Sequence, residues 1–271
     1  MTDLPVGPGG ENWGDRWELL PTTPSTNRVA AQRAREGAAE GLVVVAQQQT
    51  AGRGRLDRRW ESPPGAGLTF SVLLRPSLPD EQWPWIGLLA AVAVAETVGR
   101  VLGQEPIPSA TAGSTPRVAV KWPNDVLVDG YKIAGLLNER VETPAGAALV
   151  VGIGLNVDQR AEELPIPQAT SLRLAVGRSF TSAADRGEVL VELVDRLERC
   201  YRLAALPGER HAAYLAWCGT IGQQVRVELP TGPSLYGEAV GVDASGRLQV
   251  RTASGIEGVS AGDVVHVRRS R

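Results

Sequence analysis

Residues that build metal centres and disulfide frameworks are scarce in this sequence. Its 271 residues include two cysteines, Cys200 and Cys218, and two histidines, His211 and His266. Two thiols cannot form a disulfide framework, and the spacing of these four residues matches no zinc-binding pattern. We therefore interpret both cysteines as thiols of a protein in a reducing cytoplasm.

An excess of charge of one sign is also lacking. Lysine and arginine together number 28, aspartate and glutamate number 30, and the formal net charge is -2. A protein held to DNA or RNA mainly by phosphate contacts carries a broad basic surface. The charge balance therefore argues against nucleic acid as the main partner.

Long hydrophobic runs are missing as well. The most apolar helical run, residues 86–95, is shorter than the roughly 20 residues that cross a bilayer. The N-terminus, residues 1–14, is rich in proline and glycine and lacks the apolar core of a signal peptide. These absences predict a cytoplasmic protein without a membrane partner.

The rest of the chain predicts a large α+β domain. Ser25 caps a predicted helix over residues 26–36, and Gly37 ends it. Asp129-Gly130 is a strong hairpin signal. Clustered strands favour a mixed, mainly antiparallel sheet packed with helices over a doubly wound fold. Further helices are predicted over 81–102, 188–206 and 209–218, and strands over 42–47, 67–75, 117–122, 126–128, 131–141 and 147–157.

The C-terminal part changes character near Thr220. Short strand-like runs over 224–229, 235–242, 248–252 and 264–267 are separated by glycine-containing turns, which predicts a small β-barrel. We therefore expect a flexible N-terminus over 1–16, a large domain over 17–219 and a barrel over 220–271. Residues 105–116 are expected to form a surface loop. The strand over 147–157 suits a subunit interface and an internal core equally, so a monomer and a weak homodimer both remain open.

A glycine-interrupted basic segment follows the predicted strand over 42–47. Residues 52–60, here called the arginine loop, contain four arginines and end at Trp60. Glycine lets the backbone approach a ligand closely, guanidinium groups match carboxylate and phosphate oxygens, and Trp60 offers a flat ring for stacking. The loop is therefore typical of an anion site. A non-specific nucleic-acid contact and an ordinary solvated loop are the alternatives.

Two further polar segments lie in the predicted sheet. Lys121, Asn124 and Asp125 surround a proline that ends a strand. Their side chains suit Mg²⁺ or a nucleotide, although Pro-Asn-Asp is also standard turn chemistry. Strand alternation places Lys132 on one face with Ala134, a small residue that leaves room for a ligand; a solvated surface charge is the alternative.

Five segments together resemble the biotin protein ligase family. The resemblance covers residue 17 to the C-terminus, and it implies a class II synthetase-like catalytic domain followed by an SH3-like barrel. That fold agrees with the one inferred from the residues. The segments occur in the family's order: Ser25-Thr26-Asn27, the arginine loop, Lys-Trp-Pro-Asn-Asp over 121–125, Lys-Ile-Ala-Gly-Leu over 132–136 and Gly-Ile-Gly-Leu-Asn over 152–156.

Two features depart from the family pattern. Asp57 stands where the family commonly has a glycine; aspartate tolerates left-handed backbone angles but adds a negative charge, so the loop is expected to order less readily. The N-terminus has no room for the helix-turn-helix domain that some members carry. We therefore expect a ligase form without specific DNA binding.

The resemblance implies an ATP-dependent, AMP-forming ligase. Biotin and ATP would give biotinyl-5'-AMP, and a lysine on the biotin carboxyl carrier domain of an acyl-CoA carboxylase would then accept biotin. A lipoate or octanoate ligase or transferase of the same fold, and a nucleic-acid-binding module, are the alternatives. We expect the arginine loop to act as a lid over the adenylate, and residues 50–60 to be disordered without ligand.

The resemblance also assigns roles to individual residues. Lys132 and Arg53 are the expected catalytic residues, which bridge the biotin carboxylate and the α-phosphate. Asp125 is the expected contact of Mg²⁺. The expected biotin-binding residues are Ser25, Thr26, Asn27, Gln49, Gly52, Arg53, Gly54, Arg55, Lys132 and Gly135, and the expected ATP- or adenylate-binding residues are Arg55, Arg58, Trp60, Lys121, Asn124 and Asn156.

Overall fold

The computed structural model describes residues 13, 16–55, 58–104 and 117–266. The surface loop predicted over 105–116, Asp57 and most of the predicted flexible N-terminus lie outside the described residues. Trp13, within that N-terminal segment, is only 6% exposed and its ring centre lies 5.3 Å from that of Tyr201. The domain boundaries stay predictions.

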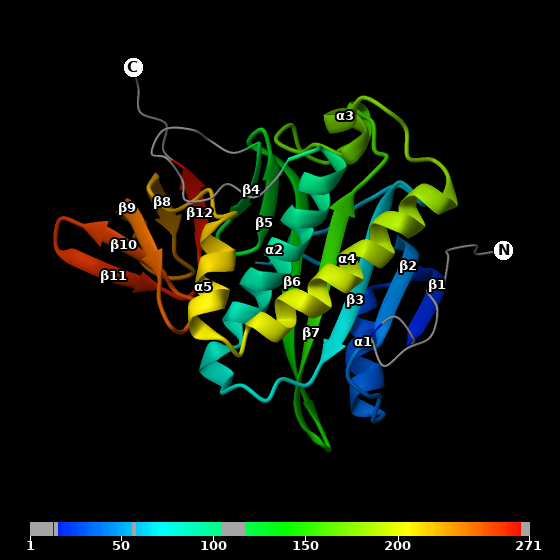
Figure 1. Ribbon diagram of the computed structural model, residues 1–271, viewed down its shortest axis with the longest axis horizontal. Coiled ribbons are helices and arrows are strands. Elements are labelled where there is room, and N and C mark those ends of the chain that lie inside the picture. Colours follow the sequence, from blue (N-terminus) through cyan, green and yellow to red (C-terminus); the bar gives the residue numbers. More distant parts are fainter. Residues whose placement is uncertain (1–12, 14–15, 56–57, 105–116, 267–271) are drawn as a thin grey trace.

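A seven-stranded sheet forms the centre of the large domain, with strand order β1-β2-β3-β7-β6-β5-β4 (Figure 1). β1 and β2 run parallel, and every other neighbouring pair is antiparallel. The prediction of a mixed, mainly antiparallel sheet is therefore confirmed. The strands are β1 (Trp17–Thr23), β2 (Val43–Gln49), β3 (Gly67–Leu74), β4 (Val118–Lys121), β5 (Asp125–Val128), β6 (Tyr131–Thr143) and β7 (Gly146–Asn156).

Helices cover both faces of this sheet (Figure 1). Successive side chains of a strand point to opposite faces, and β2 is apolar on both. Val43 and Val45 belong to the core that contains α2, whereas Val44 packs with Ala30 and Ala34 of α1. The helices are α1 (Thr26–Arg35), α2 (Pro84–Val101), α3 (Leu172–Val176), α4 (Ala183–Leu203) and α5 (Pro207–Leu215), with short 3₁₀ turns η2 (Asp80–Gln82) and η3 (Ala161–Glu163).

β7 lies inside the sheet. It pairs with β3 on one side and with β6 on the other, and its residues from Ala148 to Asn156 are buried within the chain. The strand over 147–157 is therefore core, and the oligomeric state stays open.

α2 is long and apolar enough to span a membrane by length and composition, as no other helix in the described part of the chain is. Together with η2 it covers Asp80–Val101, or 22 residues, and 78% of its apolar window is buried inside the molecule. The apolar stretch is thus longer than the run over 86–95 that the sequence indicated. Its burial beneath α4 and α5 identifies it as a core helix.

The C-terminal strands form a separate antiparallel sheet of five strands in the order β11-β10-β9-β8-β12. Within the described residues, no strand pairing joins β11 to β12, so the sheet is not a closed barrel. The SH3-like description stays a prediction. The strands are β8 (Gln224–Glu228), β9 (Leu235–Val242), β10 (Leu248–Thr252), β11 (Gly255–Val259) and β12 (Asp263–His266).

Two tryptophans of the large domain hold the turn between β9 and β10. The indole Nε1 of Trp85 donates to the carbonyl oxygens of Asp243 and Ala244 at 3.1 Å each. The Nε1 of Trp122 donates to the carbonyl of Gly246 at 3.2 Å. Because these donors are buried, the contacts fix how the C-terminal sheet sits on the large domain and bring β12 beside the end of β4.

Candidate active site

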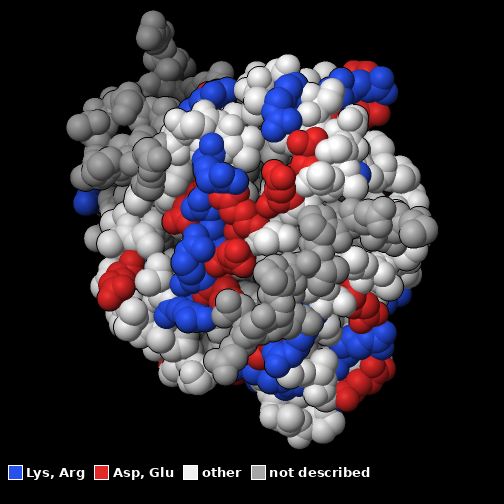
Figure 2. Space-filling model, turned by 45° about the vertical axis from the view of Figure 1, so that its right-hand side comes forward, with Lys and Arg blue, Asp and Glu red and all other residues white. Residues whose placement is uncertain are grey.

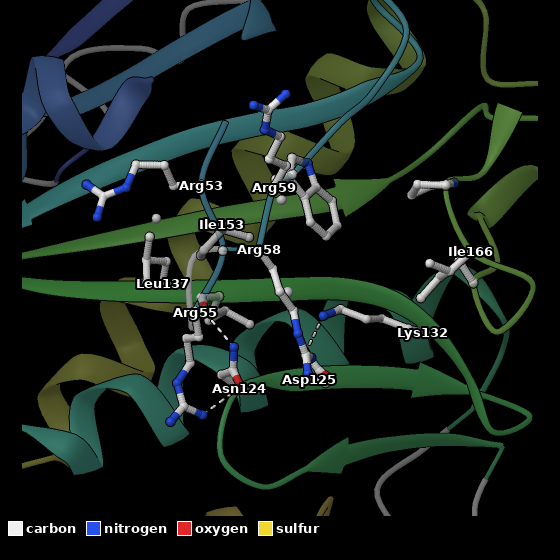
Figure 3. Close-up of a pocket in the computed structure, with 18 of the residues that line it drawn as sticks. Arg53, Arg55, Arg58, Arg59, Asn124, Asp125, Lys132, Leu137, Ile153 and Ile166 are labelled. Carbon is white, nitrogen blue, oxygen red and sulfur yellow. Dashed lines mark hydrogen bonds and ion pairs between the residues drawn. The ribbon is translucent and has the colours of Figure 1, made fainter. Parts of the chain in front are cut away.

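A cavity of about 760 Å³ lies between the start of α1, the arginine loop, strands β5, β6 and β7, and β12 (Figure 3). It collects every residue predicted for the site except Gly52, and the roles of those residues stay predictions. Those on its wall are Ser25, Thr26, Asn27, Gln49, Arg53, Gly54, Arg55, Arg58, Trp60, Lys121, Asn124, Asp125, Lys132, Gly135 and Asn156.

Glycines allow close approaches around this cavity. A Cβ at Gly52 would overlap the carbonyl oxygen of Trp60, so Gly52 closes the neck of the arginine loop instead of lining the cavity. A Cβ at Gly152 would overlap the amide of Asn27, and one at Gly154 would overlap the indole of Trp60. Residues two apart in a strand share a face, so both side chains lie over the same face of β7.

The indole of Trp60 rests on two paired glycines. Gly154 of β7 and Gly135 of β6 are cross-strand partners, and both lie directly beneath the ring. The Nε1 of Trp60 is buried and has no hydrogen-bond partner among the described residues. An unsatisfied buried donor costs about 1–3 kcal/mol. A ligand acceptor within reach of this nitrogen would remove that cost.

A network of ion pairs lies in the same cavity. Lys132 Nζ is 2.6 Å from Asp125 Oδ1, and Arg58 Nη2 is 2.5 Å from Asp263 Oδ2. Lys121 Nζ joins the two pairs, at 3.9 Å from each carboxylate. Burial opposes ionisation of Asp263, but the hydrogen bond from Arg58 and the charge of Lys121 outweigh it and hold the pKa of Asp263 below its ordinary value.

Arg55 has neutral partners instead. Its Nη1 donates to Asn124 Oδ1 at 3.2 Å and to the carbonyl of Gly262 at 3.4 Å. Burial lowers the pKa of Arg55, and the nearby carboxylates do not offset this effect. Asn124 is held in turn, because its Nδ2 donates to the carbonyl of Leu136 at 2.7 Å. Asn124, which is predicted to contact the nucleotide, is therefore in direct contact with Arg55 of the arginine loop.

The expectation that Lys132 shares a face with Ala134 is wrong. Asp125 pairs with Gly135, but Leu127 pairs with Lys132, so the register shifts by one residue and β6 contains an extra residue at Ile133. One extra residue reverses the face on which the preceding side chain lies. Lys132 therefore lies beside Gly135, where an added Cβ would be 3.1 Å from its Nζ.

A network of mostly neutral groups surrounds the start of α1. Gln49 Oε1 accepts the backbone N–H of Thr26 at 2.7 Å, and the hydroxyl of Ser71 contacts Thr26 Oγ1 at 2.7 Å and Asn27 Oδ1 at 2.6 Å. Arg53 does not face Lys132 (Figure 3): its guanidinium points the other way and pairs with Glu139 at 3.1 Å. The two expected catalytic residues are thus in one cavity but in separate networks.

Several residues of this site were not predicted from the sequence. Ser71 and Glu139 support the polar network from β3 and β6, and neither belongs to a recognised segment. The sequence offered one signal for Glu139: in a strand it shares a face with Gly135 of the Lys-Ile-Ala-Gly-Leu segment, four residues earlier. The C-terminal sheet and the segment before α3 add further wall residues: Gly262, Asp263, Val265, His266, Pro165, Ile166, Gln168 and Ala169.

His266 enters the cavity from β12. Its Nε2 lies 3.3 Å from Thr220 Oγ1, which also accepts the backbone N–H of Trp122 at 3.0 Å. Burial, and then the positive charge of Lys121, lower the pKa of His266 to about 4. The imidazole is therefore neutral at physiological pH.

Two family models match separate parts of the chain, one in the large domain and one over the C-terminal strands. Residues 19–156 match the model of the Biotin/lipoate A/B protein ligase family, and residues 220–267 match the Biotin protein ligase C terminal domain. A biotin (acetyl-CoA-carboxylase) ligase of Mycobacterium tuberculosis is 39% identical over 271 residues, covering 99% of this chain and 94% of that protein.

Two further similarities extend over most of the chain. The bifunctional ligase/repressor BirA of Bacillus spizizenii is 35% identical over 246 residues, which cover 89% of this chain and 70% of that protein. The solved biotin protein ligase from Aquifex aeolicus in complex with biotin and ATP is 28% identical, with a TM-score of 0.72 and coverage of 94% of this chain and 99% of that chain. These matches confirm the predicted mixed α+β fold, and the chain belongs to the Biotin/lipoate A/B protein ligase family.

Proposed function

We propose that this chain is a biotin protein ligase. Biotin and ATP give biotinyl-5'-AMP and pyrophosphate, and a lysine amine of a biotin carboxyl carrier domain then takes the biotinyl group and releases AMP. The observation that carries the proposal is the single cavity of about 760 Å³ that joins a cationic network at Lys132 to a polar network at Thr26. Activation of the acid needs the first network, and recognition of its neutral ring needs the second.

The first half-reaction brings two anions together. A carboxylate oxygen of biotin forms a bond to the α-phosphorus, and the bond from that phosphorus to the departing pyrophosphate breaks. Positioned cations lower the barrier by neutralising both anions. Lys132 supplies one such charge, and Arg55 and Arg58 hold phosphates. Arg53 is the second proposed catalytic cation, and it acts while it stays paired with Glu139.

Biotin's ureido ring requires neutral donors and acceptors. Ser25 and Thr26 offer them at the start of α1 and Gln49 offers them at the end of β2, while apolar strand residues offer a wall for the valeryl chain. Leu137 of β6, the cross-strand partner of Gly152, is the wall residue that suits this chain. The arrangement favours a neutral bicyclic ring with an apolar tail over a second charged group.

The nucleotide would be held by the other predicted residues. Trp60 packs against the adenine, while Lys121, Asn124 and Asn156 contact the nucleotide. Asn156 is buried and its Nδ2 already donates to the carbonyl of Thr170 at 2.9 Å, so it acts chiefly by shaping the wall.

Mg²⁺ fits this site only together with the nucleotide. Within the described residues, no group of three or more His, Cys, Asp or Glu side chains could hold a metal ion. Mg²⁺ is commonly bound by one or two carboxylates plus substrate phosphates, and Asp125 offers such a carboxylate beside Lys132. When bound, the ion would screen the charge of the departing pyrophosphate.

In the second half-reaction the neutral amine of the acceptor lysine attacks the carbonyl of the mixed anhydride. An amide bond forms, AMP leaves, and the amine loses a proton. The proposed acceptor is the carrier domain of an acyl-CoA carboxylase. We further propose that the protein acts in the cytoplasm as a monomer or weak homodimer, without specific DNA binding.

Pyrophosphate exchange tests the proposed function. The protein is incubated with ATP, labelled pyrophosphate and either biotin or lipoate, and we expect label to enter ATP only with biotin. Transfer is then measured with an isolated carrier domain and with a variant of that domain that lacks the acceptor lysine. Exchange that requires lipoate and not biotin would replace the proposal with a lipoate ligase.

The nucleic-acid alternative has less support. Basic and acidic side chains are interleaved on the face shown in Figure 2, and no broad basic patch appears there. Three arginines of this protein's loop also have partners within the protein: Arg53, Arg55 and Arg58. Salt-dependent binding to nucleic acid without any adenylation would favour this alternative.

A further inference from the structure

Glu139 is not one of the residues that line the cavity, yet it contacts two residues that do. Its Oε2 accepts the Nδ2–H of Asn27 at 2.7 Å, and its Oε1 pairs with Arg53 Nη1 at 3.1 Å. The side chain of Glu139 is 30% exposed and that of Arg53 is 57% exposed. One carboxylate thus joins the start of α1 to the arginine loop.

Asn27 depends on this carboxylate for its orientation. The residue is 5% exposed, and its Nδ2 donates its other hydrogen to the carbonyl of Leu137 at 3.1 Å. Its Oδ1 accepts from the hydroxyl of Ser71 and lies against Gly152, where a Cβ would overlap it. Loss of Glu139 would leave a buried amide hydrogen unsatisfied, which is costly.

The orientation of Asn27 passes to the residues proposed to hold the ureido ring. Ser71, which donates to Asn27, also contacts Thr26 Oγ1, and the backbone N–H of Thr26 donates to Gln49. A rotated Asn27 amide would present Nδ2–H instead of Oδ1 to Ser71. The hydrogen-bond directions of Thr26 and Gln49 would then no longer be set.

Among the described residues, Glu139 is the only side-chain partner of Arg53. Arg55 and Arg58 fasten the arginine loop toward β5 and β12. The Glu139 pair fastens the same loop toward β6, on the other side. The arginine loop is therefore held on two sides of the cavity by residues that do not belong to the loop.

We propose that Glu139 is a positioning residue of this site: it orients Asn27 for recognition of the neutral ring and anchors the arginine loop through Arg53. The inference rests on the proposed biotin ligase function. The two effects are separable, because a glutamine carbonyl still accepts from Asn27 but carries no charge toward Arg53.

Three variants separate the effects. Glu139→Ala removes both contacts, and Glu139→Gln removes only the charge. Glu142→Ala is the matched control, since this carboxylate lies on the same strand, is 73% exposed and pairs only with Arg140 among the described residues. Biotin affinity is measured by calorimetry without nucleotide, and release of labelled biotinyl-5'-AMP is measured after its formation.

We expect Glu139→Ala to weaken biotin binding roughly tenfold or more, the size of one unsatisfied buried donor. Glu139→Gln should bind biotin almost as the wild type does and release the adenylate roughly two- to fivefold faster, because the lost ion pair is partly exposed. Adding Glu139→Gln to Arg53→Ala should change release no further. The Glu142→Ala control should match the wild type in both measurements.

Wild-type affinity for biotin in Glu139→Ala, or unchanged adenylate release in Glu139→Gln, would overturn the inference. If Glu139→Ala does not fold, the release rate of Glu139→Gln with and without Arg53→Ala decides the outcome alone. A wild-type protein that neither binds biotin nor catalyses biotin-dependent exchange would instead refute the proposed function. The two failures are therefore distinguishable.

Discussion

Lowering the pH from about 7 to about 5 tests whether His266 is uncharged in the folded protein. Burial and the charge of Lys121 place its pKa at about 4 in the folded chain, against an ordinary value of 6.5. Between these values the unfolded chain binds a proton that the folded chain refuses. The stabilisation is therefore complete above about pH 6.5 and is lost as the pH falls toward 4.

The expected loss follows from the same two pKa values. Each pH unit within the window is worth about 1.4 kcal/mol, so at about pH 5 the protein should have lost roughly 2 kcal/mol of its free energy of unfolding. In the folded chain the pKa values of Asp263 and Asp243 lie below the ordinary value of 3.8. These carboxylates therefore titrate at a lower pH than the one at which His266 acts.

Urea denaturation followed by tryptophan fluorescence measures this dependence. The wild type and His266→Gln are compared at about pH 7, 6 and 5, where we expect the free energy of unfolding of the variant to be nearly flat. A variant that loses as much stability as the wild type would refute the reasoning, because other groups would then cause the loss. A flat wild type would show that His266 is protonated without cost in the fold.

Three further substitutions have separate expected outcomes. Lys132→Ala should slow adenylate formation on the order of a hundredfold while changing the free energy of unfolding by at most about 1 kcal/mol; near-normal single-turnover rates would exclude Lys132 from catalysis. Asp263→Asn removes the charge that holds Arg58, so labelled adenylate should leave roughly two- to fivefold faster, and an unchanged rate would contradict a loop held by β12. Trp217→Ala should cost about 3–5 kcal/mol in urea denaturation, because Trp217 is 3% exposed and packs against Gly99; a loss below about 1 kcal/mol would contradict its place in the core.

Local patterns predicted most of the sheet but not its edge strand β1. The hairpin at Asp129-Gly130 is confirmed, with positive φ at both residues. β1 was missed because Pro21 interrupts its apolar run, and proline argues against a central strand. An edge strand tolerates proline. Its parallel pairing with β2 across α1 also leaves no turn signal between the two strands.

The site was predicted less completely because it depends on register and on distant segments. Spacing alone could not reveal the extra residue at Ile133 that moves Lys132 beside Gly135. Nor did Asp263 and His266 show a recognisable motif, since they lie in a short, ordinary strand. They reach the cavity because Trp85 and Trp122 donate hydrogen bonds to the β9–β10 turn. These bonds join residues that are far apart in the chain.

The pairing of cations in the cavity indicates where a ligand anion gains most. Lys132 and Arg58 each face a carboxylate, Asp125 and Asp263, so an anion at either cation must compete with an existing partner. Among the described residues, Arg55 has only the neutral oxygens of Asn124 and Gly262 as hydrogen-bond partners, and burial lowers its pKa. A negative ligand group there would pair with a half-buried guanidinium without displacing a protein carboxylate. Of Arg55 and Arg58, Arg55 is therefore the one that we propose for the phosphate of a bound adenylate.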